Sequence, residues 1–363
     1  MNCRTVCPRK LHGSRLRHAA LALALLGGGL AIAAAPPPSN PSSPSVQSAG
    51  AHRAGPDAEA IQRATALVNG GKCQAAHATL QAALNAHPTD ARVDEALSRL
   101  AFGAGHTAQA LKYAHAAERR APRDGHYWML LAIEQTAALQ HAGFFARIWG
   151  LHHIKFDLSQ AASLERRNAL ALLFLQQMNA HTPAVLGGDG ADAHHEFSLL
   201  QRIDPGAAIA SLAMDAALKK QWAQATRDLN SAIERDRSKA TSVACLLVVG
   251  LIMHARHYRS ARTVLRHLII RYPGLRGAHY ELAVDDLHEK AHLREARREL
   301  RQHLSAPATA CTSAASRAAA HYRMGQFYEL NHEPKQATTQ YHVALRLDTH
   351  LVKARHALSR LTQ

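Results

Sequence analysis

The chain has 363 residues, with 43 lysines and arginines against 27 aspartates and glutamates, and a formal net charge of +16. These charges are interspersed, and the sequence contains neither a basic DNA-binding region nor an aromatic stacking platform, so we expect no nucleic-acid partner. A positive surface of this kind favours contact with anionic polysaccharide, lipid headgroups or acidic protein surfaces.

The N-terminal residues have the pattern of a secretory signal peptide. Five basic residues precede an apolar run over residues 19–35, and Ala31, Ile32 and Ala33 form the small-x-small pattern of a cleavage site. We therefore predict a signal peptide over residues 1–33 and a periplasmic protein, exported across the inner membrane of a bacterium. The alternative is an uncleaved helix that anchors the protein in the inner membrane, although the run is shorter than the ~20 residues that a span requires.

The next segment, residues 34–56, is rich in proline and serine. This composition predicts a stiffened, disordered linker. The first helical repeat is therefore expected to begin at residue 57.

From residue 57 onward the sequence repeats a helical pattern. An alanine recurs at steps of 34, 115, 36, 35 and 41 residues, and a larger side chain usually stands four residues after it. A small residue allows two antiparallel helices to approach closely, and the larger residue fills the space beside it. This self-similarity indicates an array of helical hairpins rather than one closed core. The recurring residues are Ala76, Ala110, Ala225, Ala261, Ala296 and Ala337.

The first unit has small residues at Ala64, Ala76 and Ala83, Gly71 in its turn and Pro88 at its end. With these residues it resembles the tetratricopeptide repeat family, whose units place small residues and a final proline at the corresponding positions. The resemblance implies an all-α solenoid of about seven helical hairpins. Its expected parts are N-terminal repeats over 57–124, degenerate repeats over 125–205, C-terminal repeats over 206–349 and a capping helix over 350–363.

The family pattern fails in the middle of the chain. Phe144 stands where the second helix of the third unit should have a small residue. Residues 159–180 are apolar nearly all round, which predicts one long, deeply buried helix. Three glycines and a proline in residues 182–190 then predict a loop. We expect one or two degenerate hairpins in this part.

The resemblance also implies where a partner binds. In the family, a concave groove is lined by residues of the first helix of each unit that project away from the second helix. Charges at these positions change sign along this chain, which would orient an extended peptide with its acidic end toward Arg92 and its basic end toward Glu281. The predicted groove residues are Arg92, Glu95, Arg99 and Phe102 in the second unit, Glu281, Asp285 and His288 in the sixth, and Tyr322, Gln326 and Glu329 in the seventh.

We therefore predict a non-catalytic scaffold or adaptor of the cell envelope that binds a protein partner and needs no cofactor. Envelope proteins of the resembling family commonly assist secretion, exopolysaccharide or cell-wall machinery, so the expected partner belongs to such machinery. A polysaccharide-export accessory module is an alternative. It would need exposed aromatic rows, which only Trp128, Trp149 and Trp222 could begin to supply.

One motif points instead to an enzyme. Residues 288–292 read H-E-x-x-H, which resembles the zincin metalloprotease signature, and Glu329 is a candidate third ligand. In the repeat frame, however, His288 ends the first helix of its unit and His292 lies beyond the turn, so the two rings would not share a helical face. We expect no metal site, and a zinc metalloprotease with repeats remains the alternative.

Cysteine usage gives little information. Loss of residues 1–33 leaves Cys73, Cys245 and Cys311, an odd number. Cys73 and Cys245 fall at positions where a small buried thiol is expected. We therefore expect no structural disulfide.

Overall fold

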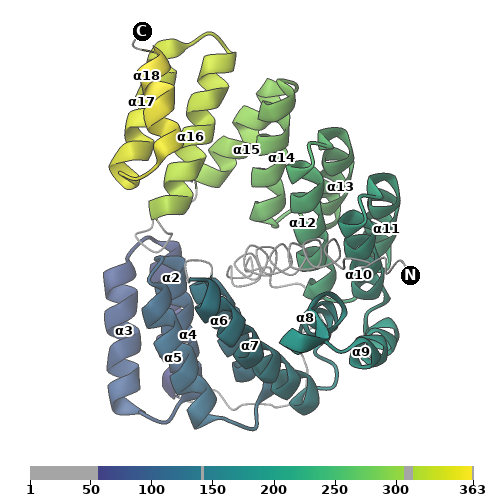
Figure 1. The fold of residues 1–363 in the computed structure, drawn as a ribbon. Helices are drawn as coiled ribbons and strands as arrows, with labels where there is room; N and C mark the ends of the chain where they lie inside the picture. Colours follow the sequence, from purple (N-terminus) through teal and green to yellow (C-terminus); the bar gives the residue numbers. More distant parts are fainter. Residues whose placement is uncertain (1–55, 140–142, 306–313, 362–363) are drawn as a thin grey trace, which may run out of the picture.

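The computed structural model describes residues 56–139, 143–305 and 314–361 (Figure 1). Within these ranges the regular structure is entirely helical, with seventeen α-helices and one short 3-10 helix. The helices form eight consecutive pairs followed by a single last helix, one pair more than expected. The predicted all-α repeat fold is therefore confirmed. The predicted signal peptide and linker lie outside the described residues, apart from Pro56.

The first four pairs occupy the N-terminal half of the described chain. Their helices are α2 (Pro56–Asn69) with α3 (Cys73–Ala86), α4 (Ala91–Gly103) with α5 (Thr107–Arg120), α6 (Gly125–Leu139) with α7 (Phe144–Leu164), and α8 (Ala169–His181) with α9 (Gly190–Ile203). The 3-10 helix η1 (Ala184–Leu186) lies in the loop between α8 and α9.

The other four pairs occupy the C-terminal half of the described chain. They are α10 (Pro205–Leu218) with α11 (Trp222–Glu234), α12 (Lys239–His254) with α13 (Tyr258–Arg271), α14 (Arg276–Glu289) with α15 (Leu293–Ser305), and α16 (Ala314–Leu330) with α17 (Pro334–Leu347). The last helix is α18 (Val352–Leu361), which packs against α17.

The recurring alanines lie at the crossings between the helices, as the sequence predicts. All six have no exposed surface. The larger residues four positions later, such as Leu229, Leu265 and Leu300, are also fully buried. Close approach of the two helices in each pair therefore depends on a side chain no larger than a methyl group at this position.

The middle of the chain keeps the repeat architecture, but the small residue that allows the two helices to approach stands at a different position. Where α6 and α7 come together, the close backbone approach is at Gly125, because a Cβ atom there would lie 2.9 Å from the carbonyl oxygen of Ala161. Gly150, six residues beyond the Phe144 position where the family pattern expects a small residue, meets only the end of the Leu139 side chain. The segment thus contains two hairpins, α6 with α7 and α8 with α9, of which α7 is unusually long at 21 residues.

The prediction of one long helix over residues 159–180 is wrong. Helix α7 ends at Leu164 and α8 begins at Ala169. Asn168 separates them: its side chain accepts a hydrogen bond from the N–H of Ala171 at 3.0 Å and donates one to Glu165 at 2.9 Å. A side chain that caps the first free N–H groups in this way starts a new helix.

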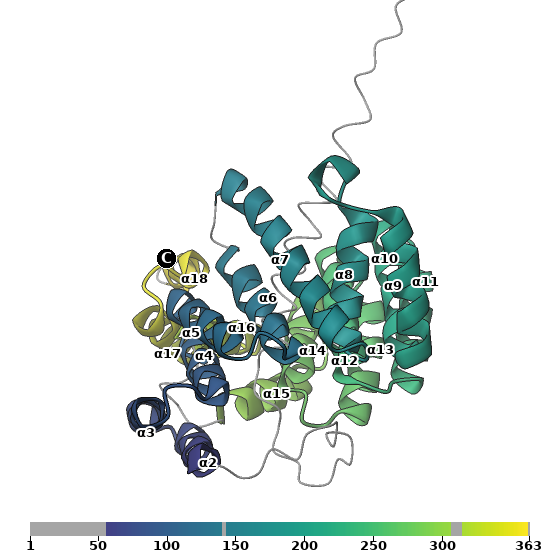
Figure 2. The ribbon, with the colours of Figure 1, turned by 90° about the horizontal axis from the view of Figure 1, so that it is seen from below.

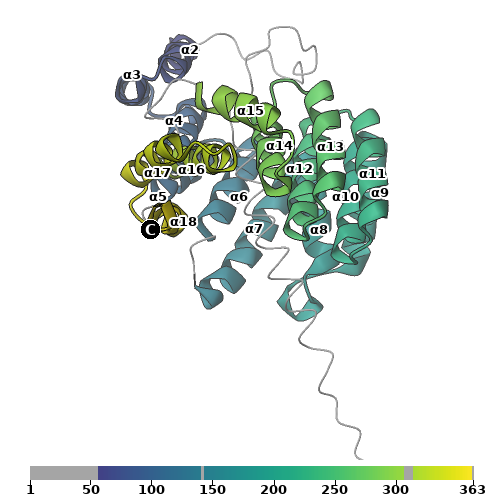
Figure 3. The same ribbon diagram turned by 90° about the horizontal axis from the view of Figure 1, so that it is seen from above.

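The pairs follow one another along a curve, so the C-terminal helices α16, α17 and α18 return to the side of the molecule occupied by α2 to α5 (Figure 1). The views from below and from above, in which these two groups overlap, agree with this arrangement (Figures 2 and 3). Helices α8 and α12 lie on the inner side of the curve, and α9, α11 and α13 lie on its outer side.

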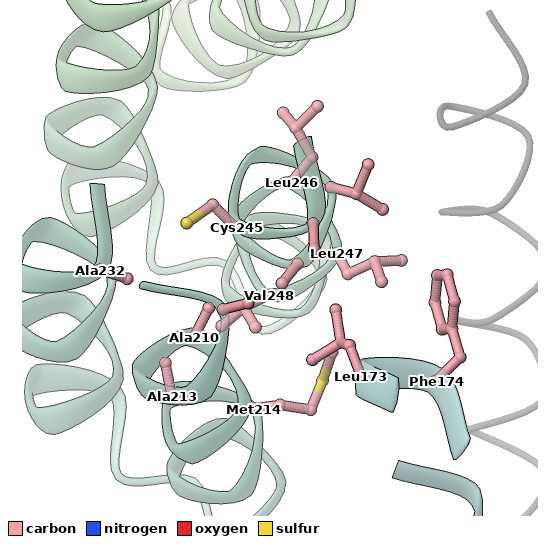
Figure 4. Packing of buried hydrophobic residues seen from close by; sticks show 14 of the residues in the cluster. Leu173, Phe174, Ala210, Ala213, Met214, Ala232, Cys245, Leu246, Leu247 and Val248 are labelled. Carbon is pink, nitrogen blue, oxygen red and sulfur yellow. The ribbon is translucent and has the colours of Figure 1, made fainter. Parts of the chain in front are cut away.

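The largest hydrophobic cluster joins the helices from α6 to α14. In its centre, Ala210 and Ala213 of α10 face Cys245 and Val248 of α12, and Leu173 of α8 completes the contact (Figure 4). The repeats at either end have smaller, separate clusters. The middle of the array therefore has the most extensive core.

The two cysteines in the described residues differ. Cys245 is fully buried and free. Cys73 is only half-buried and is disulfide-bonded, and the other half of that bond lies outside the described residues. The expectation of no structural disulfide is therefore wrong. An odd number of cysteines requires only that at least one thiol stays unpaired, and of the two described cysteines Cys245 is the free one.

Candidate partner-binding groove

First helices of their pairs, such as α8 and α12, lie on the inner side of the curve, and the ten predicted groove residues fall on three other first helices. Four lie on α4, three on α14 and three on α16. Helices α14 and α16 contact each other, whereas α4 belongs to the second pair of the array. The predicted residues on α14 and on α16 therefore lie on neighbouring helices. Those on α4 lie on another part of the inner face.

The arginines of α4 are already paired. Arg92 contacts Asp90 at 2.6 Å, and Arg99 contacts Glu95 at 2.5 Å. Glu95 also contacts His126 of α6 at 2.9 Å. Burial would raise the pKa of Glu95, but the hydrogen bond and charge of His126, with help from Arg99, lower it below its ordinary value. This part of the inner face is therefore a network of compensated charges and has little excess positive charge.

Asp285 is not on the exposed part of the inner face. Its side chain is fully buried and forms an ion pair with Arg262 of α13 at 2.9 Å. The neighbouring Asp286 is equally buried and lies 3.0 Å from the same guanidinium. A buried pair of this kind joins two successive repeats. Its carboxylates are therefore inaccessible to a basic peptide.

The other two predicted residues of α14 are at least partly exposed. His288 is exposed, and its ring stacks on that of Tyr258 with 5.2 Å between ring centroids and 9° between ring planes. Glu281 is half-buried, and burial raises the pKa of its carboxyl group while Arg323 of α16 lowers it. The net charge of this part of the face depends on which basic residues surround it.

The three residues of α16 lie half-buried beside α17. Glu329 accepts a hydrogen bond from the hydroxyl of Tyr341 at 2.6 Å and lies 3.5 Å from Arg360 of α18. Gln326 accepts a hydrogen bond from Arg323 at 2.8 Å. The ring of Tyr322 lies 5.7 Å from that of Tyr341. Of these residues, Tyr322 offers the largest apolar surface to a partner.

A hollow of about 360 Å³ opens between α12, α14 and the start of α13. Its lining comprises His288 and five residues that the sequence analysis did not propose: Gly250, Met253, His254, Tyr258 and Val284. The predicted groove residues stand at the second, fifth, ninth or twelfth position of their units, and in the unit that begins at Ser242 the ninth and twelfth positions are Gly250 and Met253. Two of the five missed residues therefore had a signal in the sequence.

A second cavity, between α8, α10 and α12, is much smaller. Its volume of about 20 Å³ is enough for one water molecule, and Gln177, His181 and Ser211 supply polar groups in a lining that is otherwise apolar. This space is a packing gap in the core, too small for a side chain of a partner.

The three candidate zinc ligands have other surroundings. His288 lies in the last turn of α14, and His292 lies beyond the end of that helix with a left-handed backbone at φ 49°. Glu329 is engaged by Tyr341 and Arg360. Across the described ranges, no three histidine, cysteine, aspartate or glutamate side chains are grouped as a metal would require.

The three tryptophans do not form a row. Trp149 of α7 is 71% exposed, whereas Trp128 of α6 and Trp222 of α11 are partly buried. Trp128 donates its indole N–H to the carbonyl oxygen of Pro122 at 2.8 Å. An extended aromatic platform for polysaccharide is not built from these residues. No helix within the described ranges has both the length and the apolar character needed to cross a bilayer.

Comparison with known proteins gives structural matches only. No family model matches the sequence, and no curated protein matches it either. Yeast Tom70 is 12% identical, covers 96% of this chain and 70% of its own, and superposes with a TM-score of 0.54. The chain has the tetratricopeptide-repeat fold.

Other solved structures give weaker matches. Cut9–Hcn1, a hetero-tetramer of the APC/C, is 12% identical and matches 84% of this chain with a TM-score of 0.42, and this chain spans only 55% of that one. YrrB, a tetratricopeptide-repeat protein with an unusual peptide-binding site, is 12% identical, matches 68% of this chain and 97% of its own, and has a TM-score of 0.33. At such identities the likeness concerns the fold alone.

Proposed function

We propose that this tetratricopeptide-repeat protein is a non-catalytic scaffold of the bacterial cell envelope that holds a protein partner on its inner face. The observation that carries the proposal is the hollow at Tyr258 and His288, which opens on the inner face between two successive first helices. The alanines close the crossings between paired helices, and this hollow opens between helices of different pairs. Phe102 and Tyr322 add apolar contacts on the same face.

Export to the periplasm is supported by the signal-peptide pattern of residues 1–33. The test is to express the full chain in a bacterium, fractionate the cells and sequence the N-terminus of the recovered protein. A new N-terminus near residue 34 in the periplasmic fraction supports the proposal. An intact N-terminus in the inner-membrane fraction supports the anchored alternative instead, and an intact chain in the cytosol contradicts both.

The location of the partner is tested by photo-crosslinking in the envelope. A photoreactive amino acid is placed at Phe102 or Tyr322 on the inner face and, as the matched control, at Ile270, which is 78% exposed on the outer helix α13. We expect a discrete crosslinked protein from the inner positions alone. Equal crosslinking from Ile270, or none from the inner positions, contradicts binding on the inner face. Identification of the crosslinked protein shows whether it belongs to secretion, exopolysaccharide or cell-wall machinery.

A metal-dependent hydrolase is the function that these contacts favour least. His288 stacks on Tyr258, and Glu329 is held by Tyr341 and Arg360. Zinc content of the purified full chain distinguishes the two functions, because a zinc enzyme holds about one ion per chain. A scaffold holds none stoichiometrically.

A further inference from the structure

Helices α13 and α15 together carry an exposed basic surface away from the hollow. On each helix the arginines are spaced by three, four or seven residues, which places them on one side of that helix. The guanidinium of Arg266 on α13 lies 2.7 Å from Glu295 on α15, so the two rows of arginines adjoin. The exposed arginines are Arg259 and Arg266 on α13, and Arg294, Arg298 and Arg301 on α15.

Most of the positive charge on this surface is not neutralised. Helix α13 contains no acidic residue. Glu295 lies between two arginines, 2.7 Å from Arg266 and 3.6 Å from Arg298. The buried Glu299 makes the other contact of Arg298 at 2.7 Å. Three of the five arginines form no ion pair with any described residue, namely Arg259, Arg294 and Arg301.

An apolar side chain stands in the same row as the arginines of α13. Ile270 follows Arg266 by four residues and Arg259 by eleven, and it is 78% exposed. The single tyrosine of α13 and α15, Tyr258, is stacked on His288 at the hollow and is not part of this surface. The surface therefore offers one aliphatic side chain among guanidinium groups, and no exposed aromatic ring on which a sugar could stack.

We propose that this surface docks the protein on a membrane that contains anionic phospholipid. Guanidinium groups bind phosphate oxygens through paired N–H donors, so the five arginines suit lipid headgroups. Ile270 would enter the boundary between headgroups and acyl chains, where buried apolar area adds to the attraction of basic residues for anionic lipid. The inference adds a second surface to the scaffold and does not depend on what the inner face binds.

The first test measures flotation of the full chain with lipid vesicles. Vesicles of phosphatidylcholine alone report the binding due to other parts of the chain, including the apolar run of residues 19–35. Replacing about a third of this lipid with phosphatidylglycerol should raise the affinity by about tenfold or more, and about 0.5 M salt should reverse the gain. Equal binding to the two kinds of vesicle would overturn the proposal.

Two matched triple variants locate the contact. The first replaces three arginines of the surface, and the second replaces three exposed arginines in turns elsewhere, so that both lose the same charge. We expect the first to lose most of the gain from phosphatidylglycerol, by about tenfold or more, and the second to keep it. Equal losses would show attraction by net charge alone and would contradict the proposal. The substitutions are Arg259→Gln, Arg294→Gln and Arg301→Gln in the first, and Arg123→Gln, Arg166→Gln and Arg167→Gln in the second.

Ile270→Ser tests the apolar contact without a change of charge. We expect it to weaken binding to the anionic vesicles by about fivefold or more, because an apolar side chain no longer leaves water. Val185→Ser is the matched control, since Val185 is 91% exposed on η1. Unchanged binding of Ile270→Ser would indicate a purely electrostatic contact, such as one with an anionic polysaccharide, and would overturn the lipid assignment.

Photo-crosslinking on the same vesicles identifies the contact directly. A photoreactive amino acid at Ile270 should yield an adduct with the mass of a phospholipid. The same amino acid at Trp149, which is 71% exposed on α7, should yield none. An adduct at Trp149 and none at Ile270 would place the membrane contact on α7 and refute the proposal.

The outcomes separate this inference from the scaffold function, which is scored by a crosslinked protein and not by a lipid adduct. If inner-face crosslinking succeeds while the first triple variant floats with anionic vesicles like the wild type, the scaffold function stands and the membrane surface is wrong. If inner-face crosslinking fails while the arginines and Ile270 are required for flotation, the membrane surface stands and the scaffold function is wrong.

Discussion

Single residues with a left-handed backbone end the first helix in six of the eight pairs. Gly71 and Gly105 do so in the first two pairs, and lysine, arginine or histidine does so in the last four. The turn is closed in each case by a hydrogen bond back to the helix, such as that from the N–H of Gln221 to the carbonyl oxygen of Ala216 at 2.8 Å. This geometry is the common glycine-ended helix terminus, and a side chain in it carries a steric cost.

Lys220 allows this cost to be measured. Its φ is 62° and its side chain is exposed, so Lys220→Gly removes strain without removing a buried contact. We expect the free energy of unfolding to rise by about 0.5 to 1.5 kcal/mol in urea titrations. Lys219→Gly is the matched control, because Lys219 has an ordinary negative φ of −82°. Stabilisation by both changes, or by neither, would contradict the role of the left-handed position.

Glu134 is a second residue whose contribution to stability can be measured, through its dependence on pH. Its side chain is fully buried in α6, and one oxygen accepts a hydrogen bond from the hydroxyl of Ser98 at 3.5 Å. Burial raises the pKa of Glu134 to about 8, against which Ser98 and Arg99 have smaller, opposing effects. The neutral acid is therefore the form that suits the folded protein.

The sign of the pH dependence follows from this. An acid whose pKa is higher in the folded state stabilises the fold fully below its unfolded pKa, and the contribution is lost as pH rises through the folded value. Glu134 thus predicts falling stability from about pH 5 to pH 9, and Asp157 and Glu196, with pKa values raised by burial to about 7, act in the same direction. We expect Glu134→Gln to remove at least about 2 kcal/mol of this loss, since each unit of pKa corresponds to about 1.4 kcal/mol. If the unfolding free energies of the wild type and of Glu134→Gln change in parallel with pH, Glu134 ionises freely in the folded protein.

At the scale of the element, α18 covers the end of the array. Ala354 and Ala357 of α18 are buried against Tyr341 and Ala344 of α17. Terminal repeats of such arrays need a helix with a polar outer surface to stay soluble. A chain that ends at Asp348 should therefore expose the apolar side of α17.

We expect this truncated chain to unfold at lower urea concentration and to self-associate, as measured by circular dichroism and by light scattering. Val352→Lys, in the full chain, is the control, because Val352 is 54% exposed and its replacement changes the surface of α18 without uncovering α17. A truncated chain that remains monomeric with the wild-type midpoint would contradict the capping role.

The sequence predicts the repeated elements well and the exceptions poorly, for a physical reason. The alanine at each crossing must be small because two backbones meet there, so its spacing reports the hairpins directly. At α6 and α7 the close approach is made by Gly125 against the carbonyl oxygen of Ala161, at positions that only the structure reveals. The break between α7 and α8 is also hidden, because a capping residue such as Asn168 leaves no mark on a hydrophobic pattern.

The candidate site shows the same limit. Position along the repeat predicts which helix face points inward, and His288 is exposed and lines the hollow. It does not predict which charges are compensated by other repeats, since the pairing of Asp285 with Arg262 depends on tertiary contacts. The stacking of His288 on Tyr258 likewise joins residues that are separated in the sequence.

At the scale of the whole molecule, each pair of helices mainly contacts its neighbours, so stability should vary along the array. The most extensive core joins α6 to α14, and the clusters at the two ends contain far fewer buried residues. Local opening needs less free energy where fewer apolar contacts are broken. The protein should therefore open from its ends while the middle stays folded.

Amide hydrogen exchange measures this gradient in the full chain. We expect α10 and α12, whose buried residues form the centre of the core, to exchange slowest, and α2 and α18 to exchange fastest. Reduction of the disulfide at Cys73 should accelerate exchange in α2 and α3 because that bond restrains the N-terminal pair, and should leave α10 and α12 unchanged. Ala261→Leu, which overpacks the crossing of α12 and α13, should instead accelerate exchange in the middle and cost about 1 to 3 kcal/mol. Uniform exchange along the chain, or equal responses to reduction and to Ala261→Leu, would show that the array unfolds as one cooperative unit rather than repeat by repeat.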